Sequence, residues 1–165
     1  MLHAVSRYYA SRNKETGRRQ MRLKNGNWVV VCDAGKYVVY ENQGDTDRLD
    51  LRVISFDENT NPPTHQQGSD RPGRLSSPDG QNASVGDTDW HAQEETRFIS
   101  MLARQMDGWA KGEPSRRFVL IADPKSMGTL RQSLNDHTLS RIDHSVTGDH
   151  AHRPVEAVEA LINGA

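Results

Sequence analysis

The run of apolar residues from Phe118 to Ala122 is the feature that most limits how this chain can fold. Five consecutive apolar residues leave no polar face, which is typical of a strand buried on both sides by crossover helices. Such a strand needs helical segments before and after it, and the sequence offers both. We therefore expect an α/β fold in which "RRFVLIAD" forms an interior strand.

Three strand signals precede this run. "WVVVC" and "KYVVY" are β-branched segments separated by "DAG", which predicts a hairpin with strands at Trp28 to Cys32 and Lys36 to Tyr40. "RLDLRVISFDE" alternates apolar and polar residues, which predicts a third strand that is half buried and antiparallel to its neighbour. The fold is expected to open with an antiparallel meander of three strands.

Helical signals surround the buried run. Apolar residues at three- and four-residue spacing predict a long amphipathic helix over about residues 88–110, capped by Asp87 or Asp89. The later segments predict a second helix, a strand, and a closing helix with Pro154 in its first turn: "PKSMGTLRQSLNDH", "TLSRIDHSVTG" and "RPVEAVEALING". The order β-β-β-α-β-α-β-α predicts a mixed sheet that is antiparallel first and parallel afterwards.

The length of 165 residues fits one domain of about 100–200 residues. We divide the chain into a basic tail over residues 1–26, expected to be disordered, and a single α/β domain over residues 27–165 with a long polar loop at 57–87. Residues 1–25 carry a net charge of +6 and the remainder −7. The tail is an arm for RNA or another polyanion, or a solvated tail, or the product of an upstream start codon with the domain itself beginning near Met21.

Cysteine usage and hydropathy indicate the compartment. The single cysteine, Cys32, lies inside an apolar run, so we expect a buried, reduced thiol and no disulfide framework. No run approaches the roughly 18 apolar residues of a membrane span, and the N-terminus lacks the apolar core of a secretory signal peptide. The sequence therefore predicts a cytoplasmic protein.

The polar loop contains a candidate binding motif, "GSDRPGR". Pro72 fixes its own backbone angle and Gly73 tolerates a positive φ, so the flanking arginines are presented from a tight turn. These arginines either grip a phosphate or carboxylate of a partner, or pin the loop to acidic residues at the start of the long helix. The candidate binding residues belong to this turn and to the later "DGQ": Gly68, Asp70, Arg71, Pro72, Gly73, Arg74, Gly80 and Gln81.

The string "DWHAQEETRF" supplies a second candidate set at the start of the long helix. Trp90, Glu94 and Arg97 occupy neighbouring positions on a helix. Glutamates near a helix N-terminus are explained by the helix dipole, and a role in general acid-base catalysis would need a pocket and a raised pKa. The set comprises Asp89, Trp90, His91, Glu94, Glu95 and Arg97.

Carboxylates and histidines elsewhere offer no complete catalytic or metal site. Asp33 follows the first strand, where ribonuclease-H-like sheets can hold a metal ligand, but we find no second and third carboxylate for it, and turn chemistry accounts for it. His150 and His152 fall near a strand end, and we interpret them as solvated loop histidines rather than Zn or Ni ligands. We expect no metal, no cofactor and no catalytic residue.

Several of these strings together resemble the bacterial host attachment protein family. They are "NPPTHQQGSDRPGR", "TDWHAQEETRF", "FVLIADPKSMGTLRQSL" and "RPVEAVEALI", and the likeness covers residues 27–163. Members of that family resemble the middle domain of archaeo-eukaryotic peptide-release factors, which has a ribonuclease-H-like sheet. In those domains a loop ahead of the long helix carries a Gly-Gly-Gln tripeptide that enters the peptidyl-transferase centre, and "DGQ" stands at that place here.

The resemblance implies a binding protein rather than an enzyme. It would associate with ribosomes, structured RNA or the translation machinery through the turn at Gly68 to Arg74 and the loop that follows. One alternative is an envelope-associated factor that promotes attachment of the bacterium to host cells. Another is a hydrolase of phosphoester or peptidyl-tRNA bonds that depends on Gln81, Asp33 or Glu94. The sequence leaves the oligomeric state open.

Overall fold

The strands of the computed structural model, which describes residues 21–60 and 83–164, form one mixed sheet. They are β1 (Trp28–Cys32), β2 (Lys36–Asn42), β3 (Leu51–Glu58), β4 (Phe118–Ala122) and β5 (Ile142–Thr147), in the spatial order β3-β2-β1-β4-β5. The β3-β2-β1 part is antiparallel, and the β1-β4-β5 part is parallel. The predicted α/β class, with a meander followed by α-β-α-β-α, is confirmed.

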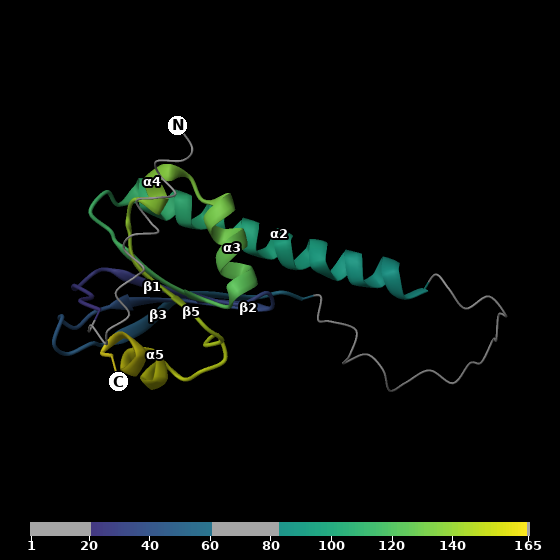
Figure 1. Ribbon diagram of the computed structural model, residues 1–165. Helices are drawn as coiled ribbons and strands as arrows, with labels where there is room; N and C mark the ends of the chain where they lie inside the picture. The colour runs from purple at the N-terminus through teal and green to yellow at the C-terminus, as the bar shows by residue number, and fades with distance from the viewer. Residues whose placement is uncertain (1–20, 61–82, 165) are drawn as a thin grey trace.

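Helices cover both faces of this sheet. Within the described ranges they are α2 (Ala83–Gly112), α3 (Pro124–Ser133), α4 (Asp136–Leu139) and α5 (Val155–Ile162). Figure 1 shows α2, α3 and α4 on one face and α5 on the other. The sheet is therefore the middle layer of three, which explains why all five residues of β4 are buried, as an interior strand requires.

Each face of the sheet has its own apolar core, because successive side chains of a strand point to opposite faces. The core beneath α2 and α3 includes Val30, Val39, Phe118, Leu120, Leu102 and Met106. The core beneath α5 includes Val29, Val31, Tyr40, Ile121, Val158 and Ile162. Cys32 belongs to the first core and is 1% exposed, which confirms the prediction of a buried thiol.

Helix α2 begins at Ala83, five residues before the predicted start, and ends at Gly112, two residues after the predicted end. Asp87 and Asp89 lie inside the helix, so the prediction that one of them caps it was wrong. Among the described side chains of α2, the first buried one is Phe98. The apolar periodicity that predicts the helix starts only there, and the polar turns before it carry no such signal.

Strand β3 is much more exposed than its alternating sequence predicts. Leu51 is 5% exposed, but Val53 and Phe56 expose 56% and 67% of their surface. Helix α5 has eight residues and contacts β3 at the first residue of the strand. There Glu159 Oε1 accepts a hydrogen bond from the Leu51 backbone N–H at 3.0 Å. The prediction of a half-buried strand was wrong because so short a helix cannot cover a strand of this length.

Two helix boundaries in the C-terminal half also differ from those predicted. The predicted helix over 124–137 is divided, because Asn135 Oδ1 accepts the Thr138 N–H at 2.8 Å and caps a separate helix, α4. Pro154 precedes α5 as its N-cap residue and does not lie in its first turn. The first difference arises from cap chemistry, which sets a boundary without changing the apolar pattern. Pro154 makes no side-chain cap hydrogen bond, so the second difference is an ordinary shift of a helix boundary.

The residues just ahead of β1 lie against the body of the domain. The Met21 backbone N–H donates to the Ile162 carbonyl at 2.9 Å, and Leu23 is 2% exposed. Residues 1–20, which hold most of the predicted basic tail, lie outside the described residues, and the division of the chain into tail and domain stays a prediction. In the described ranges, none of the helices combines the length and apolar character that crossing a bilayer requires.

Candidate functional site

The carboxyl ends of the parallel strands lie along one edge of the sheet. Asp33 follows β1, Asp123 follows β4, and Gly148 follows β5. The chain leaves β1 toward β2 on one side, and it leaves β4 toward β5 on the other. In open α/β sheets, ligands bind outside the carboxyl ends of strands at the point where the order reverses in this way. We therefore take this edge as the candidate functional site.

Asp33 is held in the hairpin between β1 and β2. Its Oδ1 accepts the backbone N–H groups of Gly35 and Lys36, both at 2.8 Å. This is the turn chemistry that the sequence predicts for an aspartate at a hairpin. Its Oδ2 lies 3.0 Å from Nε2 of His152. The second oxygen therefore joins the hairpin to the segment between β5 and α5.

The two histidines of that segment make contacts that the sequence analysis did not anticipate. His152 contacts Asp33, although its side chain stays 68% exposed. The ring of His150 packs over Gly148, where a Cβ would come within 2.7 Å of Nε2. The sequence could not reveal these contacts because they depend on where β5 ends relative to β1. Among the described residues, no group of three or more His, Cys, Asp or Glu side chains is arranged to hold a metal ion.

Asp123 is the second carboxylate at this edge, and the sequence did not single it out. Its Oδ2 accepts the backbone N–H groups of Lys125 and Ser126, both at 3.1 Å, and so caps α3. Its Oδ1 is buried and has no hydrogen-bond partner among the described residues. Burial first, and then the charges of Asp123 and Asp33, raise the pKa of the Cys32 thiol from 9.0 to about 12. A thiol in this state is not a nucleophile near neutral pH.

Cys32 is expected to be inert to thiol reagents in the folded protein. At pH 8, a pKa of about 12 in place of 9.0 lowers the thiolate fraction about a thousandfold. The folded protein should therefore react with a disulfide reagent such as dithionitrobenzoate only as fast as it unfolds, and the denatured chain should react at once. Rapid labelling of the folded protein at pH 8, with no loss of its circular dichroism, would contradict the assignment.

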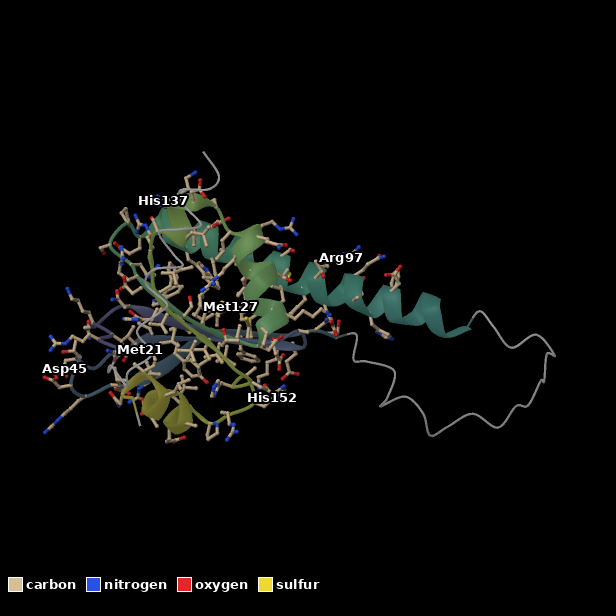
Figure 2. The ribbon with its side chains drawn as sticks, in the orientation of Figure 1. Met21, Asp45, Arg97, Met127, His137 and His152 are labelled. Atoms are coloured by element: carbon tan, nitrogen blue, oxygen red, sulfur yellow. The ribbon has the colours of Figure 1, made fainter. Side chains whose placement is uncertain are left out.

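Helix α2 leaves the body at the same edge of the sheet. Figure 1 shows its N-terminal half projecting beyond the sheet and the other helices. At the root of the projection, Phe98 packs on Tyr37 with ring centroids 5.8 Å apart, and Glu95 pairs with Lys125 of α3. The fifteen residues from Ala83 to Arg97 extend about 22 Å at 1.5 Å per residue. Figure 2 places Arg97 and His152 toward the same end of the molecule, opposite Asp45.

The predicted residues of the helix start all lie on these projecting turns. Glu94 Oε1 lies 3.2 Å from an Arg97 guanidinium nitrogen, which confirms that the two are neighbours on the helix. Trp90 is 55% exposed. Glu94 and Glu95 were predicted as possible partners of the loop arginines. In the structure each pairs with another cation, Glu94 with Arg97 and Glu95 with Lys125. The predicted loop residues lie outside the described residues: Gly68, Asp70, Arg71, Pro72, Gly73, Arg74, Gly80 and Gln81.

Sequence reasoning missed a row of cations on the solvent face of α2. Arg97, Arg104 and Lys111 are exposed and follow one another at seven-residue intervals, and we call them the α2 basic row. Over residues 96–112 the exposed side chains of α2 include these three cations and no carboxylate. Asp107 is turned aside, where its Oδ1 accepts the Thr138 hydroxyl. The same periodicity that identifies the apolar face of α2 also places these cations on one face.

Comparison with known proteins identifies the family. Residues 28–162 match the family model described as "Protein required for attachment to host cells". No curated protein matches the sequence. The matched residues extend from the first residue of β1 to the last residue of α5, and so include the whole sheet and the candidate site. Because the match covers well over half of the chain, this protein belongs to the family of proteins required for attachment to host cells.

Proposed function

We propose that this protein is a non-enzymatic binding protein that associates with ribosomes or other structured RNA. The observation that carries the proposal is the α2 basic row, because exposed cations on one helix face with no carboxylate between them favour a polyanion. Successive cations are about 10 Å apart along the helix at 1.5 Å per residue. Each cation that neutralises a phosphate releases counterions, which favours binding.

The projection of α2 supports the same proposal. Helical turns without core contacts are only marginally stable in water, so a partner that packs against them would stabilise them. The N-terminus of α2 at Ala83 therefore lies away from the body, and the segment that holds the predicted turn of Arg71 and Arg74 precedes Ala83 in the sequence. The proposal includes the resemblance to the middle domain of release factors. In those domains the loop ahead of the long helix enters the ribosome.

Carboxylates on the projecting turns limit where RNA would bind. Glu94 and Glu95 are neutralised by Arg97 and Lys125, but Asp89 is exposed nearer the tip. An exposed carboxylate repels RNA phosphates. We therefore assign the phosphate contacts to the C-terminal part of the row and to the loop, and not to the first turns of α2.

Attachment to host cells is the alternative that the description of the family favours. In that case the exposed Trp90 and the projecting turns would contact a component of the cell envelope. This alternative predicts no salt-dependent binding to RNA. The same experiment therefore separates the two functions.

The variant Arg104→Glu/Lys111→Glu is expected to bind ribosomes about tenfold more weakly or worse. The slope of log affinity against log salt concentration should fall by about two, one for each lost phosphate contact. The measurement is co-sedimentation of the purified protein with ribosomes at a series of salt concentrations. A further variant, Arg71→Ala/Arg74→Ala, tests the predicted turn and should lower the affinity again.

The matched control is Lys24→Glu/Arg48→Glu, which makes the same change in net charge on exposed side chains beside the β2–β3 turn. This control variant should show the same slope of log affinity against log salt concentration as the unmodified protein. Absence of ribosome binding by the unmodified protein at low salt would sink the proposal and favour an envelope partner. Equal weakening by both double variants would show that net charge, and not the α2 basic row, governs binding.

A further inference from the structure

Strand β3 is an open edge of the sheet. It stands first in the order β3-β2-β1-β4-β5, and β2 is the one strand paired with it in the described part of the chain. It has eight residues, about 27 Å at 3.4 Å per residue. Natural edge strands are commonly kept short or protected by proline or lysine, and β3 has neither residue. Its outward N–H and C=O groups can pair with another strand.

Exposed apolar side chains are concentrated on this strand. Val53, Ile54 and Phe56 are 56%, 38% and 67% exposed. Among the described residues, the other large hydrophobic side chain with such exposure is Trp90 on α2. Exposed apolar residues that lie singly are ordinary, but three within four positions of an edge strand indicate an interaction surface.

The pairing with β2 shows which face of the sheet these side chains occupy. Val53 lies opposite Tyr40, and Phe56 lies opposite Val38. Both partners belong to the core beneath α5, so Val53 and Phe56 extend that face beyond the helix. The register shift between Val39 and Tyr40 leaves Ile54 without a partner on β2, which is why side chains three positions apart share a face.

Two charged residues of β3, Arg52 and Asp57, lie on the opposite face. Arg52 is opposite Glu41, and Asp57 is opposite Tyr37, whose ring belongs to the core beneath α2. Arg52 makes an ion pair with Asp50 at 2.7 Å, and the side chains of both are exposed. Exposed pairs of this kind contribute little, so the guanidinium can still serve a second carboxylate.

We propose that β3 pairs with β3 of a second copy of this chain, antiparallel about a twofold axis, so that the two sheets become continuous. In the register that sets Val53 opposite Phe56 of the second copy, Arg52 stands opposite Asp57 of that copy, and the twofold axis repeats both contacts. Apolar pairs then lie on the α5 face and opposite charges on the α2 face. Both kinds of cross-strand pair stabilise a sheet.

Two requirements select this register: the apolar side chains of both copies must lie on one face of the joined sheet, and Arg52 must lie opposite Asp57. A shift by one residue would place the apolar side chains of the two copies on opposite faces of the joined sheet. A shift by two residues keeps the faces but separates Arg52 from Asp57. The complementarity of β3 with itself therefore favours a second copy of the chain over an unrelated strand.

Charge reversal tests the pairing directly. Arg52→Asp sets two pairs of carboxylates against each other in the homodimer, and Asp57→Arg does the same with guanidinium groups. Each variant is expected to raise the dissociation constant of the dimer about tenfold or more, because like charges across an interface repel. An equal mixture of the two variants restores both opposite-charge contacts, so it should form a heterodimer about as tight as the unmodified dimer. The measurement is sedimentation equilibrium over a series of concentrations.

Two further variants separate the interface from general effects. Arg131→Asp reverses an exposed charge on α3 and should leave the dimer unchanged. Phe56→Ser removes the apolar contact and should also weaken the dimer, with the melting temperature of the monomer unaffected. Hydrogen exchange should show that the amides of β3 become protected as the concentration rises. A monomer at every concentration up to the solubility limit, or a dimer that neither reversal weakens, would overturn the proposal.

Discussion

Phe118→Ala is expected to lower the free energy of unfolding by about 3–5 kcal/mol. Phe118 is fully buried on the interior strand β4, and its ring meets Trp28 edge to face with centroids 6.2 Å apart. Trp28 in turn lies edge-on to Trp109 of α2 at 5.3 Å. Removing the ring therefore leaves a cavity where β1, β4 and α2 meet, and it removes an aromatic contact as well.

The matched control for this substitution is Phe56→Ala. The side chain and the change are the same, but Phe56 is 67% exposed, so the expected change is within about 0.5 kcal/mol. Urea unfolding followed by circular dichroism measures both, at a protein concentration that keeps the chain monomeric. Loss of less than about 1 kcal/mol in Phe118→Ala would mean that the core beneath α2 is not packed as described.

Asn42→Ala is expected to lower the free energy of unfolding by about 2–4 kcal/mol. Asn42 is fully buried at the end of β2. Its Nδ2 donates to the carbonyls of Leu23 at 2.8 Å and Asp45 at 3.2 Å. Its Oδ1 accepts the N–H groups of Gly44 at 3.0 Å and Asp50 at 3.1 Å. Alanine leaves several of these buried or partly buried backbone groups without their side-chain partner, and each group left unpaired destabilises the folded state.

The control for Asn42 is Asn25→Ala, because the Asn25 side chain contacts the same β2–β3 turn from the segment ahead of β1. Asn25 Nδ2 also donates to two backbone carbonyls, those of Gln43 and Gly44, both at 2.9 Å, but these bonds are exposed. Water replaces an exposed donor, so a change of about 0.5 kcal/mol or less is expected. Thermal unfolding of both variants gives the comparison. Equal effects would show that burial is not what makes the Asn42 bonds important.

The strands that could be predicted from the sequence are those whose residues carry the signal themselves. β1, β2 and β4 are apolar runs bounded by turn residues. The predicted positions of β1 and β4 agree with the structure, and β2 continues two residues beyond its predicted end, to Asn42. The exposure of β3 could not be predicted in the same way. Its alternation is real, but whether the apolar face is covered depends on the length of α5, which folds from the other end of the chain.

The candidate site could be predicted only in part, for a similar reason. The residues at the start of α2 are close in sequence, so helical spacing was enough to make Glu94 and Arg97 neighbours. The contact of Asp33 with His152 joins segments from opposite ends of the domain. It exists because β1 and β4 are parallel neighbours and β5 continues that order, and no local pattern encodes this arrangement.

The hydrogen bond between the Met21 N–H and the Ile162 carbonyl brings the segment ahead of β1 and the end of α5 to one place. Nothing in the sheet requires a chain terminus at this place, since a short linker could join the end of α5 to Met21. The covalent break could instead fall between Thr60 and Ala83, next to the projecting tip of α2. A circular permutant built in this way keeps every pair of neighbouring strands. Its α2 is no longer joined covalently to β3, so the length of the projecting helix can be changed without changing the connections within the sheet.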